Sequence, residues 1–292
     1  MDISKSLSWG YQKLKKKSTS AILDSEVLLA MILKKSKEFL YTYPEHNLTA
    51  TQLTKFKKLI NQRAKGAPIA YLLGYKEFFG LNFIVNKNVL IPRPDTELLV
   101  EEVTGQIKKT EGNKKIILID AGTGSGCIPV VIGKRSFDSV LRTPLRMTIL
   151  ATDISASALT VARHNAQKNK VKIKFFQGNL LEPLSKILYK NSKAQIFITA
   201  NLPYLTTKQM KEKTIQKEPR LALYGGKDGL ELYQKLLQQI QNLKLTPATI
   251  FLEIDPSQKQ KILTLIKKIL PNAKAEIKKD LAKKNRLVII KN

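Results

Sequence analysis

Five short apolar segments, separated by helical segments and turns, constrain the fold of this 292-residue chain more than any other feature. They lie at Ile116–Asp120, Thr148–Asp153, Lys172–Gln177, Gln195–Asn201 and Thr249–Asp255. Most of them lack the polar alternation of a half-exposed strand, which is typical of parallel strands that are covered on both faces. Helices are predicted between these segments at Ser155–Lys168 and Gly229–Leu243, and after the last of them at Ser257–Leu270. Strands that alternate with helices in this way predict an α/β fold.

Two further strands are predicted at the end of the chain, at Ala275–Leu281 and Arg286–Ile290, joined through residues 283–285. We expect them to pair antiparallel and to close the sheet. The result is a Rossmann-like, doubly wound sheet of seven strands, counting the five above. The stretch Phe137–Arg146 is predicted to be a loop insertion.

Residues 1–75 are predicted to be a small helical bundle. Their apolar residues recur at steps of three and four, as in Ile22, Leu23, Val27, Leu28, Met31 and Ile32. Asp24 and Thr49 are candidate N-caps, and Pro44 and Pro68 are candidate helix breaks. Nothing in this part of the chain indicates catalysis.

The pattern changes at Tyr71. Tyr75–Ile91 interleaves apolar residues with Gly and Asn, which predicts a β-hairpin. The segment IPRPDTE follows, in which Asp95 or Thr96 can cap a helix at Glu97–Lys109. We therefore expect three parts: a helical domain at residues 1–73, a β-hairpin linker at residues 74–92 and an α/β domain at residues 93–292.

Composition excludes several classes of protein. Cys127 is the only cysteine, so neither an intrachain disulfide nor a cysteine-rich zinc site can form, and with only two histidines we predict no metal. The apolar runs are far shorter than the roughly 20 residues that span a bilayer, and no signal-peptide core precedes the first lysines. We expect a cytoplasmic protein that does not enter membranes.

The net charge of +28 suggests a polyanionic partner. However, only eight of the 51 basic residues are arginine, which is the residue favoured for bidentate phosphate and base recognition. The basic residues are also spread along the chain rather than concentrated in one element. A lysine-rich solvated surface is thus favoured over a binding surface, and direct nucleic-acid binding is compatible with the charge but not required by it.

A glycine-rich loop follows the strand at Ile116–Asp120. In DAGTGSG, Gly122, Gly124 and Gly126 alternate with Thr123 and Ser125, so the backbone can approach a ligand and expose N–H groups at the start of a helix. This spacing differs from the G-x-G-x-x-G of dinucleotide sites and suits a short carboxylate better than a pyrophosphate. Asp120 can meet a cation beside that carboxylate, so an amino-acid moiety fits.

Asp153 ends the next strand, where a carboxylate accepts hydrogen bonds from ribose hydroxyls. A glycine loop followed by this acid indicates a nucleoside that carries an amino acid. S-adenosylmethionine fits that description, and we predict it as the cofactor.

Asn201-Leu202-Pro203-Tyr204 follows the strand at Gln195–Asn201, at the edge of the sheet where ligands bind in open α/β folds. An amide nitrogen is a poor nucleophile, because its lone pair is delocalised into the carbonyl. A site that methylates one must hold both N–H bonds with acceptors. The Asn201 side chain and the Leu202 carbonyl can supply these acceptors, Pro203 can hold the backbone and Tyr204 can supply an aromatic wall. An ordinary strand-to-turn exit is the alternative, since Asn and Pro are common in turns.

The motifs PIAYLLGYKEFFGLNF, IPRPDTE, DAGTGSG, NLPY and EPRLALYGGKDGL together resemble the bacterial HemK/PrmC family, the release factor glutamine methyltransferases. The resemblance runs from about Ile69 to the C-terminus. It implies a class I methyltransferase domain that transfers a methyl group to the glutamine amide in the GGQ loop of peptide chain release factors. It also implies that the helical domain helps to hold that protein substrate, and we expect a monomer.

The resemblance implies specific residue roles. Asn201, Pro203 and Tyr204 correspond to catalytic positions. The same three residues and Leu202 correspond to the substrate site. Asp120, residues 122–126, Asp153, Asn179, Leu180 and Asn201 correspond to cofactor positions. Two residues depart from the family pattern: Leu202 stands where Pro is usual, and Asn179 where Asp is usual beside the adenine.

Two other functions remain open at this point. NLPY is also the motif of ribosomal RNA adenine dimethyltransferases, and a net charge of +28 suits such a substrate. Those enzymes, however, resemble neither IPRPDTE nor EPRLAL. A ribosome-binding protein on a decayed methyltransferase fold is the non-enzymatic alternative, and the intact glycine loop and Asn201 argue against it.

Overall fold

The computed structural model describes residues 1–110, 115–138, 147–191, 193–211 and 217–292. These residues form two compact units, Met1–Tyr75 and Lys76–Asn292, each with its own hydrophobic core. The predicted loop insertion lies largely outside the described residues, since Phe137 and Asp138 belong to a helix and residues 139–146 are not described.

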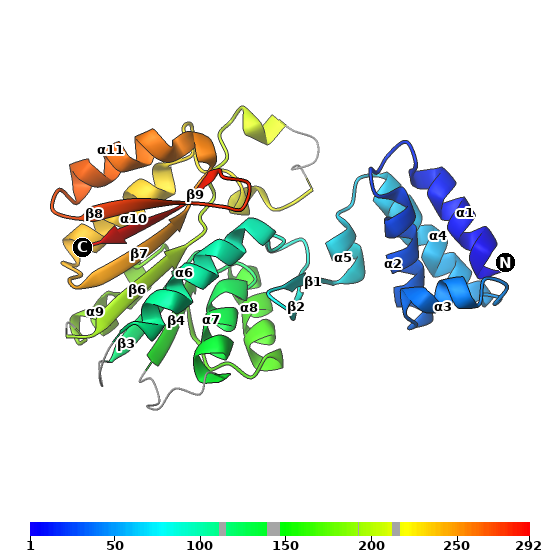
Figure 1. Ribbon diagram of the computed structural model, residues 1–292, viewed down its shortest axis with the longest axis horizontal. Helices are drawn as coiled ribbons and strands as arrows, with labels where there is room; N and C mark the ends of the chain where they lie inside the picture. The colour runs from blue at the N-terminus through cyan, green and yellow to red at the C-terminus, as the bar shows by residue number, and fades with distance from the viewer. Residues whose placement is uncertain (111–114, 139–146, 192, 212–216) are drawn as a thin grey trace. The chain divides into compact units, whose positions relative to one another are not determined.

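The first unit is a helical bundle, as predicted (Figure 1). Its helices are α1 (Ile3–Leu14), α2 (Ala21–Leu33), α3 (Lys37–Thr42), α4 (Ala50–Ala64) and α5 (Ile69–Leu73). Their apolar faces meet in a core that includes Leu14, Leu28, Phe56 and Ile60. Thr49 caps α4 through a reciprocal capping box with Gln52, which confirms that prediction.

The predicted N-cap role of Asp24 is wrong. Ser20 occupies the N-cap position of α2, and Asp24 lies one turn inside the helix with its side chain buried. Its carboxylate accepts hydrogen bonds from Ser18 and Ser20 and from Arg63 Nε at 2.7 Å. The Asp24 carboxylate, which the local sequence predicts to be a helix cap, instead forms an ion pair with Arg63, because a buried charge must be paired.

The second unit is built on a seven-stranded sheet, as predicted, in the order β5-β4-β3-β6-β7-β9-β8. The strands are β3 (Ile116–Ala121), β4 (Met147–Asp153), β5 (Lys174–Gln177), β6 (Gln195–Ala200), β7 (Ala248–Glu253), β8 (Lys274–Lys279) and β9 (Asn285–Lys291). The first five pair in parallel, and β9 pairs antiparallel with both β7 and β8. The chain order reverses between β3 and β6, which is where open α/β sheets bind ligands.

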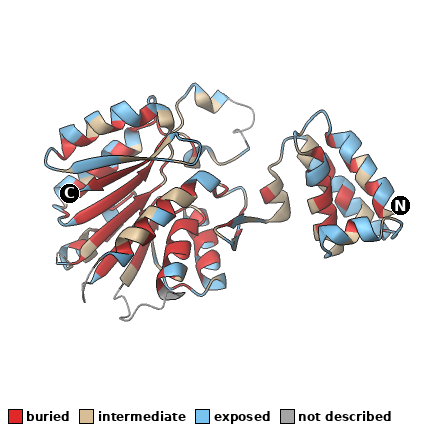
Figure 2. Ribbon diagram, in the orientation of Figure 1, coloured by how far each residue is buried: buried red, intermediate tan, exposed pale blue. Residues whose placement is uncertain are grey.

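Helices cover both faces of this sheet (Figure 1). On one face lie α6 (Glu97–Lys108), α7 (Cys127–Asp138) and α8 (Ala156–Lys168), and on the other lie α9 (Ser185–Tyr189), α10 (Glu231–Asn242) and α11 (Lys259–Ile269). Burial on both faces explains why the strands lack polar alternation. Figure 2 shows the central strands as buried and the helices as buried along one side.

Several predicted boundaries move by a few residues. β5 begins two residues later than predicted, and single 3₁₀ turns, η1 (Pro94–Thr96) and η5 (Pro256–Gln258), precede α6 and α11. The predicted hairpin is present as β1 (Tyr75–Phe78) and β2 (Leu81–Ile84), but it ends before residue 91. Almost all of it belongs to the second unit, where Asn165 of α8 bonds both the N–H and the carbonyl of Ile84.

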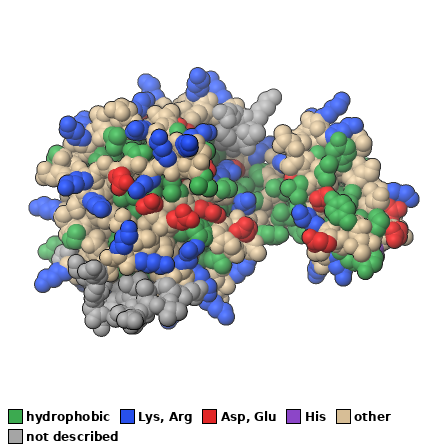
Figure 3. Space-filling model, in the orientation of Figure 1, with side chains coloured by type: hydrophobic (Ala, Val, Ile, Leu, Met, Phe, Trp, Pro, Cys, Tyr) green, Lys and Arg blue, Asp and Glu red, His purple; other side chains and the backbone are tan. Residues whose placement is uncertain are grey.

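Lysine and arginine side chains are scattered over the visible face of both units rather than gathered into one patch (Figure 3). Among the described residues, no helix is long and apolar enough to cross a membrane.

Candidate active site

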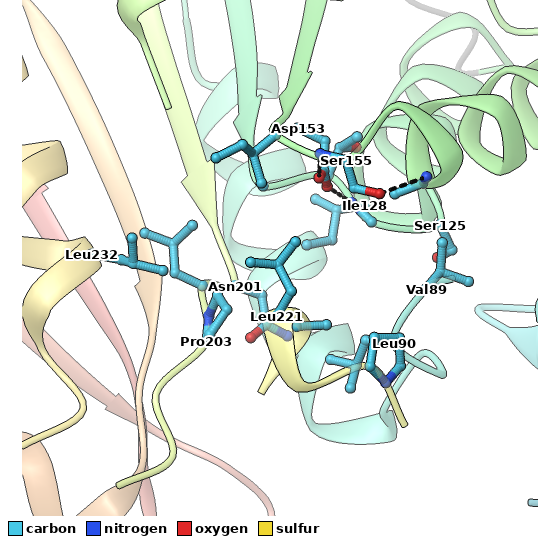
Figure 4. Close-up of a pocket in the computed structure, with 18 of the residues that line it drawn as sticks. Val89, Leu90, Ser125, Ile128, Asp153, Ser155, Asn201, Pro203, Leu221 and Leu232 are labelled. Atoms are coloured by element: carbon cyan, nitrogen blue, oxygen red, sulfur yellow. Dashed lines mark hydrogen bonds between the residues drawn. The ribbon is translucent and has the colours of Figure 1, made fainter. Parts of the chain in front are cut away.

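A pocket lies at the carboxyl ends of β3, β4, β5 and β6 (Figure 4). Its walls come from the glycine loop, from the residues that follow β4, β5 and β6, and from two segments outside the sheet. The lining residues are Val89, Leu90, Pro92, Arg93, Thr96, Gly122–Ser125, Cys127, Ile128, Asp153–Ser155, Ala158, Gly178–Leu180, Asn201–Pro203, Pro219, Leu221, Ala222 and Leu232. Most of the residues predicted from the sequence are therefore brought together.

The glycines of the loop are required by the backbone. Gly122, Gly124 and Gly126 have φ angles of 73°, 54° and 77°, which side-chain-bearing residues rarely adopt. A Cβ at Gly122 would lie 2.8 Å from Leu202 Cδ2, and one at Gly126 would lie 3.1 Å from Ala162 of α8. A Cβ at Gly124 would meet no atom within 4 Å, so this glycine borders open space in the pocket.

The loop N–H groups are used differently from the sequence prediction. Gly122 and Thr123 both donate to the Thr152 carbonyl at 2.9 Å, Gly124 donates to Asp153 Oδ2 at 2.8 Å, and Gly126 donates within the loop. These bonds fix the loop against the end of β4. The expected row of N–H groups offered to an anion is therefore largely taken up by the chain itself.

Asp153 lines the pocket as predicted. Its Oδ2 accepts from Gly124 N–H and its Oδ1 from Ser155 N–H at 2.9 Å, so the carboxylate is held rigidly (Figure 4). Burial raises its pKa despite these bonds. Each carboxylate oxygen can accept a further hydrogen bond, as a pair of ribose hydroxyls requires.

Asp120 lies beneath the glycine loop and is not part of the pocket lining. Its Oδ1 accepts from Thr199 at 2.7 Å, and its buried Oδ2 has no hydrogen-bond partner of normal geometry among the described residues, although the nearby Thr123 hydroxyl acts to lower its pKa. Burial, with a smaller contribution from the Asp153 charge, raises its pKa to about 6. An unpartnered buried carboxylate oxygen is the arrangement that a neighbouring cationic group would relieve.

Asn179 and Leu180 line the pocket after β5. The Asn179 amide donates to Glu182 Oε1 at 2.9 Å, and this bond directs its nitrogen toward Glu182. Leu180 is buried with a φ of 54°, so the chain turns sharply here and presents an apolar surface.

Asn201 is held from outside the sheet. Its Nδ2 donates to Thr96 Oγ1 at 3.0 Å, and Thr96 is the last residue of η1. Thr96 occupies the predicted N-cap position of α6, but its side chain forms no capping bond there. Thr96 of the IPRPDTE segment therefore binds Asn201 of the NLPY segment instead of capping its own helix.

The three residues after Asn201 occupy different places. Leu202 and Pro203 line the pocket, whereas the half-buried Tyr204 does not. The buried Tyr233 hydroxyl lies 3.3 Å from the Leu202 carbonyl oxygen but is closer to the Glu253 backbone carbonyl, so the Leu202 carbonyl keeps at least one lone pair for another donor. Tyr204 packs against the hydrophobic core of the second unit instead of forming the predicted pocket wall.

The EPRLALYGGKDGL segment is tied to both neighbouring motifs. Glu218 accepts from Ile91 N–H at 3.1 Å and forms an ion pair with Arg93. Further along, a Cβ at Gly225 or Gly229 would lie within 2.3 Å of the Pro203 or Tyr204 carbonyl oxygen. The glycines thus allow this segment to lie directly against NLPY, and Pro219 and Leu221 close one side of the pocket.

Sequence reasoning missed this wall of the pocket, to which the segments 89–96 and 219–222 each contribute several residues. Both segments were recognised as motifs of the resemblance, but no residue-level signal assigned them to the site. No group of three or more His, Cys, Asp or Glu side chains that could hold a metal occurs in the described part of the chain.

Family models match both parts of the chain. The PrmC N-terminal domain family matches residues 5–74, and a methyltransferase domain family matches residues 112–290. A release factor glutamine methyltransferase of Dictyoglomus turgidum is 37% identical over 97% of this chain and 95% of its own length. The chain belongs to the release factor glutamine methyltransferase family. A second relative with that name, from Coxiella burnetii, is 36% identical over 87% of this chain and 86% of its own.

Solved structures support the fold of this family member. The hMettl16 catalytic domain, solved in complex with a MAT2A 3′UTR hairpin, superposes with a TM-score of 0.54 at 15% identity and covers 90% of each chain. At this identity the likeness extends to the fold alone. The relatives confirm the resemblance inferred from the motifs and do not favour the ribosomal RNA alternative.

Proposed function

We propose that this protein transfers a methyl group from S-adenosylmethionine to the side-chain amide nitrogen of the glutamine in the GGQ loop of peptide chain release factors. Relatives that bear the release factor glutamine methyltransferase name and match nearly the full chain support this function. The observation that carries it in the structure is the orientation of Asn201, whose Nδ2 is bound by Thr96. Its Oδ1 is then the end of the amide that can accept a hydrogen bond from a substrate.

The residues of the pocket fit this cofactor. The open space beside Gly124 admits a ligand against the backbone, and Asp153 offers two rigid oxygens for a pair of hydroxyls. Asp120 is buried behind the glycine loop, and its carboxylate favours an ammonium group in the pocket electrostatically rather than by lining it. Ile154 and Leu180 add apolar surface for a base. When bound, the cofactor supplies an electrophilic methyl group on a positively charged sulfur.

The chain contributes positioning and desolvation. Asn201 Oδ1 and the free lone pair of the Leu202 carbonyl can each accept one N–H of the target amide, which aligns the nitrogen lone pair. Both acceptors also stabilise the positive charge that develops on the nitrogen. Apolar residues from the two outer segments, such as Leu90 and Leu221, exclude water from the reacting atoms.

The helical unit at residues 1–73 is proposed to hold the release factor, which the match to the PrmC N-terminal domain family supports. Because release factors act on ribosomes, the reaction belongs in the cytoplasm. A monomeric state remains a prediction from the sequence, as does the absence of a requirement for direct nucleic-acid binding.

Single-turnover methylation with labelled cofactor tests this function, with a whole release factor and ribosomal RNA as parallel substrates. We expect label on the release factor glutamine only. Asn201→Ala should slow the reaction by about 10²–10³-fold, the scale of one preorganised catalytic hydrogen bond. Asn201→Asp should be intermediate, because a carboxylate still accepts the N–H that Asn201 Oδ1 accepts but adds a charge.

Leu202→Pro serves as the matched control, since it keeps the backbone carbonyl and restores the usual residue of the family. It removes the contact between the Leu202 side chain and Gly122, so activity should stay within a few-fold of wild type. Methylation by Asn201→Ala at the wild-type rate would refute the amide-orienting role. Loss of activity in Leu202→Pro together with label on RNA would favour the RNA function.

A further inference from the structure

A buried carboxyl group without an assigned role lies next to the candidate catalytic residue. Glu253 is the last residue of β7, the strand beside β6, and is 1% exposed. Neither of its carboxylate oxygens has a hydrogen-bond partner of normal geometry in the described part of the chain. The parallel register pairs Ala200 of β6 with Leu252 of β7, so the next residues, Asn201 and Glu253, lie side by side at the ends of the two strands. Burial raises the pKa of Glu253 to about 7, against smaller lowering contributions from Thr96 and Asn201.

The charged surroundings of Glu253 do not neutralise it. Arg286 of β9 lowers its pKa, but the guanidinium is already bonded to Asp95 at 2.9 Å and Asp280 at 3.3 Å. Asp95 raises the Glu253 pKa. The other titratable groups that face Glu253 from neighbouring elements are Tyr204, Tyr233 and Cys127, whose own pKa values its charge raises.

We propose that Glu253 is a positioning residue that fixes, through Thr96, which end of the Asn201 side-chain amide faces the substrate. This inference rests on the proposed function, because it concerns the group that holds the target amide. It assigns a role to Thr96 as well, which the IPRPDTE segment places in hydrogen-bond contact with Asn201 Nδ2.

The direction of the hydrogen bonds follows from the protonation state of Glu253. Thr96 Oγ1 accepts from Asn201 Nδ2, so its one hydroxyl hydrogen is available to an ionised Glu253, which can only accept. Asn201 Oδ1 is then left to accept from the substrate. When Glu253 is protonated, its O–H can donate to Thr96 Oγ1 or to Asn201 Oδ1, and the preference for this amide orientation is lost.

Packing alone does not account for a carboxyl group at this position. An unpartnered buried carboxyl costs free energy that an apolar side chain of similar volume avoids. The surrounding core consists of residues such as Ile254 and Leu252, which an apolar residue would continue. The retained acid is therefore better explained by its neighbours Thr96 and Asn201.

The test is the pH dependence of the single-turnover rate at saturating cofactor, for wild type, Glu253→Gln and Glu276→Gln. If only the ionised form positions Asn201, the wild-type rate should rise about tenfold between pH 6 and pH 8, as expected for a pKa near 7. Glu253→Gln keeps an acceptor for Thr96 but cannot ionise, so this step should disappear while cofactor affinity stays within about twofold. Glu276 is an exposed residue of β8, and its variant should keep the wild-type step.

A second measurement separates this inference from the proposed function. The side-chain NH₂ resonances of Asn201, assigned by comparison with Asn201→Asp, should shift with pH in the free wild-type protein and stay constant in Glu253→Gln. A wild-type protein that shows this shift but leaves release factors unmethylated would refute the proposed function and leave the coupling intact. Resonances that do not titrate, or a pH step in the rate that persists in Glu253→Gln, would overturn the positioning role.

Discussion

Replacing Glu253 by Gln should stabilise the protein at alkaline pH. The folded-state pKa of about 7 lies above the ordinary value of 4.5, so the folded state binds a proton between these values that the unfolded state has released. The contribution of Glu253 to the free energy of unfolding is therefore most favourable below pH 4.5, becomes less favourable as the pH rises toward 7, and is constant above that. At about 1.4 kcal/mol per pKa unit, the difference between the folded-state and unfolded-state pKa of Glu253 corresponds to a loss of about 3 kcal/mol in the free energy of unfolding.

Glutamine escapes this penalty because it does not ionise. Its NH₂ group also requires hydrogen-bond partners, which reduces the gain, so we expect about 1–3 kcal/mol at pH 8. For a unit of this size, that corresponds to a rise of several degrees in the unfolding temperature, at roughly 2–4 °C per kcal/mol. At pH 4 the variant and the wild type should be nearly equal, since Glu253 is then protonated in both states.

The assay is thermal unfolding of the free protein at half-unit steps from pH 4 to pH 9. Glu276→Gln is the control: the Glu276 pKa is lowered, mainly by its hydrogen bond to Lys278, so its removal gives no alkaline gain. A Glu253→Gln variant that is less stable than wild type at pH 8, or whose difference from wild type does not depend on pH, would refute the reasoning. A variant that is both more stable and less responsive to pH in catalysis would show that the acid is retained for function.

Two further predictions concern binding. Asp153→Ala removes the acceptor of Gly124 and Ser155 and that of the proposed ribose, and since charge-assisted bonds contribute roughly 1.5–3 kcal/mol each, calorimetry should show cofactor affinity at least about tenfold weaker. Unchanged affinity would remove the ribose assignment. Deleting residues 1–75 should leave cofactor affinity within about twofold, because the pocket lies entirely in the second unit, but should strongly reduce turnover on a whole release factor, which needs a docking surface. Equal turnover by the truncated and full-length proteins would contradict the docking role.

The sheet and the central part of the site could be predicted from the sequence, because both depend on local patterns. Apolar runs without alternation specify parallel strands, and the residues directly after such strands meet at one edge of the sheet. This is sufficient to bring Gly122, Asp153, Asn179 and Asn201 together. The glycine loop could also be recognised in the sequence, because its positive φ angles strongly favour glycine over other residues.

The outer wall of the pocket could not be predicted in this way, because it depends on contacts between distant segments. Ile91 and Arg93 are held by Glu218, more than 120 residues away, through bonds that no local pattern encodes. The same is true of Asp24, whose carboxylate pairs with Arg63 rather than capping a helix. In each case a buried carboxylate is paired with a residue that tertiary packing brings close, and this pairing outweighs the structure that the local sequence favours.

Three acids near the ends of apolar strands show how far the sequence rule extends. Asp120, Asp153 and Glu253 each lie at the carboxyl end of a parallel strand, and the rule assigns them all to the ligand edge. Only Asp153 lines the pocket, whereas Asp120 and Glu253 are buried beneath other segments. The glycine loop covers Asp120, and Thr96 and Asn201 lie against Glu253. A strand-end acid is thus placed by its strand, but whether it binds a ligand directly or acts through a neighbouring side chain is decided by the segment that packs over it.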